Sequence, residues 1–96
     1  MIESITHESF ESILGDSVAV RLEDIDFQAV VKSVNLLRES PGQGRQPFSV
    51  VLQSQDTENH GQRTYRLSHP DLGDLELFLV PVGGDEEGIR YEIIFN

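Results

Sequence analysis

Cysteine is absent from this chain of 96 residues, and basic residues are scarce. Without cysteine the chain has no disulfide framework, no thiolate metal site and no cysteine nucleophile, and this composition fits a reducing, cytoplasmic compartment. Lysine and arginine number 7 against 17 aspartates and glutamates, which gives a formal net charge of −10. Nucleic acids and anionic membrane surfaces are bound through basic residues, so we expect neither as a partner.

Long apolar runs are also missing, and no stretch approaches the ~18 apolar residues of a membrane-spanning helix. The segment from Met1 to Glu8 lacks the basic and apolar regions of a secretory signal peptide. We therefore expect a soluble, cytoplasmic protein in which residues 1–96 form one β domain. The acidic surface has two interpretations, a solubilising coat or a face for a basic partner.

The sequence does contain a clear pattern of short strands, which is centred on residues 62–82. Residues 63–68 alternate between apolar and polar side chains, as in a half-buried strand. His69 to Gly73 has the proline and glycine of a tight turn. Residues 74–80 carry apolar side chains on both parities, which predicts a central strand covered on both sides. The two sets are Leu75, Leu77 and Leu79 on one face, and Phe78 and Val80 on the other.

The same alternation predicts four further strands. They run over Ser17–Leu22 and Phe27–Leu37, from Phe48 onward, and over Ile89–Asn96. In the second of them the apolar parity changes, which predicts a β-bulge near Val30 to Lys32. The polar segment from Gln55 to Gly61 is expected to be an exposed loop. Six short strands in meander order predict a mainly β fold, a small six-stranded antiparallel barrel or sandwich.

A short N-terminal helix is predicted ahead of the first strand. Thr6 is a suitable N-cap, Ser9 occupies the third helical position, and Gly15 ends the pattern. Phe10 and the pair Ile13 and Leu14 are spaced as one apolar face of a helix. We expect this helix to close one end of the sheet.

No motif in the chain indicates catalysis, a cofactor or a metal. The Gly83 to Glu87 segment is similar to the glycine-rich hairpin of diguanylate cyclases, but its last position is Glu and the chain is too short for that α/β domain. The acidic turn at Glu23 to Asp26 lacks the ligand spacing of a calcium loop. The histidines His7, His60 and His69 have no short ligand spacing and are expected in caps or turns. We therefore predict a protein that is not an enzyme and holds no cofactor or metal.

The segment from Arg38 to Gln46 is the best candidate for a partner contact. It is longer than the commonest hairpin loops, and excess length in a small domain is often functional. Its two arginines, Arg38 and Arg45, are among 7 basic residues in an acidic chain. We expect them to engage a carboxylate-bearing protein partner, including a second copy of the chain, or to be solvated without a partner.

Several segments resemble a small bacterial family known only as a domain of unknown function. They are Phe10 to Gly15, Pro47 to Leu52, Gln62 to Pro70, Leu72 to Gly83 and Tyr91 to Asn96. The resemblance covers nearly the whole chain and brings no catalytic residues with it. Members are often encoded beside phage-tail-collar-like proteins, which implies an accessory role near a tail-fibre or surface-appendage assembly, with a tail-collar-like protein or a second copy as the partner.

Three functions are consistent with these observations. The first is a non-enzymatic structural or interaction domain, as the resemblance implies. The second is an acidic inhibitor or nucleic-acid mimic that presents carboxylates to a basic protein. The third is a small-ligand-binding β-barrel, which requires an internal cavity.

Overall fold

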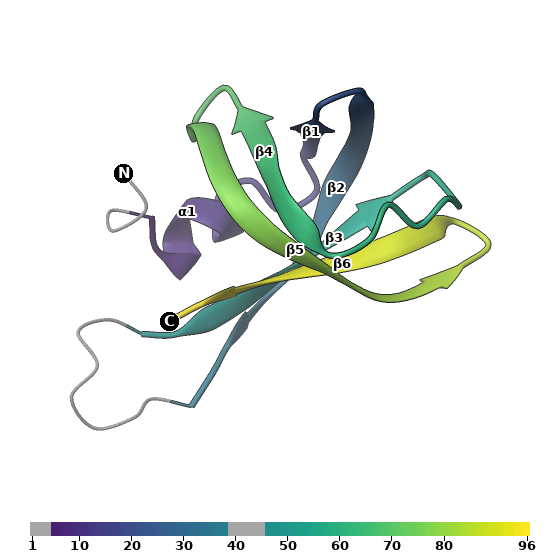
Figure 1. Ribbon diagram of the computed structural model, residues 1–96. Coiled ribbons are helices and arrows are strands. Elements are labelled where there is room, and N and C mark those ends of the chain that lie inside the picture. Colours follow the sequence, from purple (N-terminus) through teal and green to yellow (C-terminus); the bar gives the residue numbers. More distant parts are fainter. Residues whose placement is uncertain (1–4, 39–45) are drawn as a thin grey trace.

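Alternating apolar residues build six strands that close into one antiparallel barrel in the order β1-β2-β3-β6-β5-β4 (Figure 1). The computed structural model describes residues 5–38 and 46–96. Its elements are α1 (His7–Glu11), β1 (Ser17–Leu22), β2 (Ile25–Leu36), β3 (Phe48–Ser54), β4 (Arg63–His69), β5 (Gly73–Asp85) and β6 (Gly88–Phe95). The predicted mainly β fold with a short N-terminal helix is confirmed, as a barrel and not a sandwich.

The β4–β5 hairpin forms at the predicted turn. The backbone N–H of Leu72 donates to the carbonyl of His69 at 3.1 Å, and Gly73 has a φ of 76°. A positive φ at this position suits glycine, so the sequence Pro-Asp-Leu-Gly specifies the turn. The hairpin sets Leu77 of β5 opposite Tyr65 of β4, and both side chains face the barrel interior.

The prediction that β5 is covered on both sides is wrong. Leu75, Leu77 and Leu79 are buried, whereas Phe78 between them is 52% exposed. In a closed barrel each strand has one face toward the interior and the other toward the outside, so there is no central strand between two layers. Phe78 therefore lies outside the core.

The bulge predicted in β2 is confirmed. Val31 is paired with Leu52 of β3, but the next pair is Ser33 with Val51, so Lys32 has no partner across the ladder. The extra residue changes the parity of β2 and bends the strand. As a result Val31 faces the core, while Lys32 is exposed.

The helix closes one end of the barrel, here called the helix end. Thr6 is the N-cap, as predicted, and it forms a capping box with Ser9, because the N–H of Thr6 donates to the Ser9 hydroxyl at 3.1 Å. The ring centroid of Phe10 lies 5.5 Å from that of Phe95 and 6.4 Å from that of Phe48. The rings of Phe48 and Phe95 stack on each other with centroids 4.5 Å apart. The prediction that Leu14 joins this apolar face is wrong. The helix stops at Glu11, and Leu14 is 48% exposed in the turn beyond it.

The opposite end, here called the loop end, is closed by the segment between β3 and β4 (Figure 1). The His60 ring stacks on Phe27 with centroids 5.1 Å apart. The Tyr65 hydroxyl donates to the Gly61 carbonyl at 2.7 Å, and the Tyr91 hydroxyl accepts the His60 N–H at 3.2 Å. The predicted loop from Gln55 to Gly61 is present and none of its residues is buried, but two core tyrosines bind its backbone near Gly61.

Candidate functional site

The three histidines lie apart and each contacts a carboxylate. The distances are 3.1 Å for His7 to Glu11, 3.0 Å for His60 to Asp56 and 3.1 Å for His69 to Asp16. Within residues 5–38 and 46–96 there is no group of three or more His, Asp or Glu side chains that could hold a metal ion. The same part of the chain has no helix long and apolar enough to cross a membrane.

His69 has a structural position that its hydrogen bonds define. The backbone N–H of Asp71 donates to its Nδ1 at 3.0 Å, and its Nε2 lies 3.1 Å from Asp16 Oδ2. Nδ1 must be an unprotonated acceptor, so Nε2 carries the proton and donates to Asp16. The ring thus ties the β4–β5 turn to the segment before β1.

The partner-contact loop predicted from the sequence lies largely outside the described residues. Arg45 belongs to residues 39–45, of which the structure describes nothing, whereas Arg38 is exposed just after β2. The fold instead brings together two arginines that the sequence does not mark as a pair. Arg21 of β1 and Arg66 of β4 are opposite each other because β1 pairs with β4 when the barrel closes.

Arg21 and Arg66 are the middle of a charge row that crosses four strands. The register places Asp26 beside Arg21, Arg21 beside Arg66, and Arg66 beside Glu76. Arg21 Nε is 3.5 Å from Asp26 Oδ2, while the Arg66 side chain has no ion pair or hydrogen bond among the described residues. Like charges directly opposite on a sheet destabilise it, and the two outer carboxylates offset this repulsion. The Arg66 guanidinium keeps its donors available.

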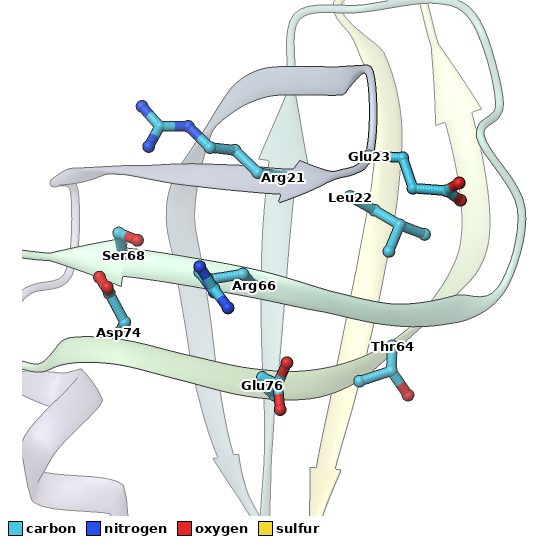
Figure 2. Close-up of a pocket in the computed structure, with 8 residues that line it drawn as sticks. All are labelled: Arg21, Leu22, Glu23, Thr64, Arg66, Ser68, Asp74 and Glu76. Carbon is cyan, nitrogen blue, oxygen red and sulfur yellow. The ribbon is translucent and has the colours of Figure 1, made fainter.

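A hollow of about 490 Å³ covers this row (Figure 2). Figure 2 shows the Arg21 guanidinium directed away from Arg66, so the two groups do not converge on one point. Two hydroxyls, two guanidinium groups and three carboxylates surround the hollow, which suits a mixed polar surface better than a single anion. Its lining residues are Arg21, Leu22, Glu23, Thr64, Arg66, Ser68, Asp74 and Glu76.

Phe78 lies next to this hollow on the same outer surface. Phe78 of β5 is paired with Thr64 of β4, and the next pair on the same outer face, two residues along each strand, is Arg66 with Glu76. The chain has 5 Phe and 2 Tyr, and Phe78 is 52% exposed while every other aromatic residue is at most 8% exposed. We refer to Thr64, Arg66, Glu76 and Phe78 as the β4–β5 face. Aromatic residues and arginine are the types that most often anchor protein interfaces.

The perturbed acid–base groups lie at the loop end and at the β5–β6 turn. Burial raises the pKa of the Tyr65 and Tyr91 hydroxyls above the usual range for tyrosine. The backbone N–H of Glu58, and then the His60 side chain, lower the pKa of the Asp56 carboxyl. At the β5–β6 turn the backbone N–H of Glu87 is the main cause that lowers the pKa of Asp85. These shifts arise from the burial and hydrogen bonds that hold the two segments in place.

Sequence reasoning missed the β4–β5 face although one signal for it was present. Phe78 has the same parity as Glu76 and Asp74, the polar side of β5, and this alternation could have placed it outside. No local signal predicts the pairing of Arg21 with Arg66, because it depends on the register between strands far apart in the sequence.

The chain was compared with protein-family models, curated proteins and solved structures. A family model described as "Domain of unknown function (DUF6916)" matches residues 5–95. No curated protein matches the chain, and no solved structure does.

Proposed function

This chain belongs to the DUF6916 family, a domain of unknown function, and from that premise we propose that it is a non-enzymatic interaction domain that docks a protein partner on the β4–β5 face. The exposure of Phe78 carries this proposal. The Phe78 ring is 52% exposed and lies beside Arg66, which has no ion pair among the described residues, so a partner that covers the ring removes its apolar surface from water.

Docking would occur on a sheet face and not by addition of a strand at this site. β4 is paired with β1 on one side and with β5 on the other, so the backbone around Arg66 is already hydrogen-bonded in both directions. A partner therefore contacts side chains, with an apolar group on Phe78 and a carboxylate on Arg66.

The filled barrel favours this role over small-ligand binding. The inward-facing side chains include Phe48, Tyr65, Leu67 and Tyr91, and each of them is 0% exposed. Barrels that bind a ligand inside keep part of this volume open. Among the described residues, the interior is occupied by packed aromatic and aliphatic side chains.

The distribution of charge favours this role over nucleic-acid mimicry. A mimic presents carboxylates together on one face at the spacing of phosphates. Four carboxylates line one hollow, those of Asp24, Asp26, Asp56 and Glu58, but His60 and Arg63 line it with them, and other carboxylates lie elsewhere, such as Glu11 in α1 and Glu76 in β5. The β4–β5 face also mixes both signs, since Arg66 lies opposite Glu76.

The family resemblance suggests which assembly supplies the partner. On that basis we place the protein as an accessory component of a bacterial phage-tail-like or surface-appendage assembly, made in the cytoplasm. A tail-collar-like protein or a second copy of the chain would then bear the complementary apolar and acidic groups.

Co-purification with three tagged baits tests the proposal. We expect the wild-type chain and a Leu14→Ser control to retain the same partner, and Phe78→Ser to lose it. Leu14 is a matched control, because it is 48% exposed but lies in the turn after α1 and does not line the hollow beside the β4–β5 face. Circular dichroism of each bait reports folding. Retention of the same partner by folded Phe78→Ser would contradict the proposal.

A further inference from the structure

A second hollow, of about 540 Å³, lies on the outside of the barrel over β2 and β3. This volume is within the ~300 to 1,000 Å³ range of small-molecule sites. Its lining residues are Val30, Lys32, Gln53, Gln55 and Glu87. None of them belongs to the β4–β5 face, so a ligand in this hollow and a partner on that face would bind independently.

Gln53 lines this hollow, and its side chain carries a buried acceptor that has no partner among the described residues. It lies on the outer face of β3 between Val30 and Arg90, and yet it is only 9% exposed. Its Nε2 donates to the Ser54 carbonyl at 2.8 Å, which fixes the orientation of the amide. The remaining atom, Oε1, is buried and has no hydrogen-bond partner among the described residues. A buried acceptor of this kind destabilises the fold until a donor reaches it, so the site favours a ligand with an N–H or O–H group.

Lys32 supplies a positive charge to the same hollow. It is the extra residue of the β2 bulge, which directs a side chain away from the regular alternation. Its ammonium group has no ion pair within the described part of the chain, although 17 acidic residues are present. Between Lys32 and Gln53 the hollow thus offers a cation and an acceptor, with the aliphatic side chain of Val30 beside them.

We propose that this hollow binds the last residue of a peptide chain. That residue carries an amide N–H, which would donate to Gln53 Oε1, and a carboxylate, which would form an ion pair with the Lys32 ammonium group. Its side chain would contact Val30. A phosphate monoester fits less well, because it has no N–H donor and its double negative charge would face Glu87.

Three small probes, titrated into the labelled protein and followed by NMR, separate the two contacts. N-acetylglycine has both the amide N–H and the carboxylate, acetate has the carboxylate without the amide, and N-acetylglycine amide has the amide without the carboxylate. We expect N-acetylglycine to shift the signals of Lys32 and Gln53, and each of the other two to bind about tenfold more weakly, the effect of one lost hydrogen bond to a charged or buried group. Equal binding of acetate and N-acetylglycine would overturn the proposal.

Variants assign the contacts to their side chains. Gln53→Leu removes the acceptor at similar volume, Lys32→Met removes the charge, and Arg63→Met is a matched control for loss of a cation elsewhere. We expect the first two to weaken N-acetylglycine binding about tenfold or more and the control to leave it unchanged. Lys32 is exposed, so its variant keeps the test decisive if Gln53→Leu does not fold. No response of the wild type, or an unchanged response in Lys32→Met, would refute the site.

Discussion

The two ends of the barrel are both closed by aromatic residues, but by different physical means. At the helix end Phe10 is 0% exposed, and the Phe48 and Phe95 rings stack with an interplanar angle of 7°. At the loop end the rings of Phe27 and His60 also stack, at 15°. There, however, hydroxyls of core tyrosines bind the loop backbone.

The difference shows how a small barrel can close with or without regular structure. At the helix end the capping box and the hydrogen bonds of the turn after α1 to Val31 satisfy part of the backbone, and the aromatic side chains contribute apolar contacts. A loop has backbone groups that must find partners when covered, and Tyr65 and Tyr91 provide them from the core. The same region places Gly88 at the start of β6 against the Ser54 carbonyl, where a Cβ atom would collide. The helix end should therefore respond to lost volume, and the loop end to lost hydrogen bonds and to pH.

The largest effect is expected from Phe48→Ala at the helix end. This change removes a ring that packs on both Phe10 and Phe95, so it combines lost apolar burial with a cavity. We expect the free energy of unfolding to fall by about 3 to 5 kcal/mol, measured by urea denaturation. A loss under about 1 kcal/mol would mean that the stack does not hold the helix end together.

A smaller effect is expected from Tyr91→Phe at the loop end. The ring remains, but the His60 N–H loses its acceptor, which should lower the free energy of unfolding by about 1 to 3 kcal/mol. Hydrogen exchange of the loop amides should accelerate, while amides of α1 keep their wild-type rates. Equal acceleration in both places would show that the two ends open together.

The smallest effect is expected from alkaline pH, and it should act on the loop end. The pKa of Tyr65 and of Tyr91 is raised in the folded protein, chiefly by burial, so both hydroxyls keep their protons to higher pH than in the unfolded chain. Their contribution to stability is therefore complete below a pH of about 10, the unfolded value, and is lost as pH rises through the folded values. Thermal melting measured over about one pH unit on either side of the unfolded value should show the decline.

The matching control is the double variant in which both tyrosines are phenylalanine. It has no tyrosine left to titrate, so its melting temperature should decline less over the same pH range. A decline equal to that of the wild type would assign the pH dependence to other groups.

The sequence by itself determined the features that depend on neighbouring residues. The turn at Gly73, the bulge at Lys32 and Thr6 as the N-cap of α1 were all predicted and are all present. Each arises from local backbone preferences and from the alternation along one strand, which a sequence contains completely. The number of strands depends on the same signals.

Only the tertiary structure decided which outer faces stay exposed and which distant residues meet. Alternation placed Phe78 opposite in parity to Leu77, but only barrel closure leaves that side without a second layer. The pairing of Arg21 with Arg66 and the burial of Gln53 likewise arise from contacts between strands that are distant along the chain. Residue types and their spacing do not contain the register between such strands, because it is set by packing of the whole barrel.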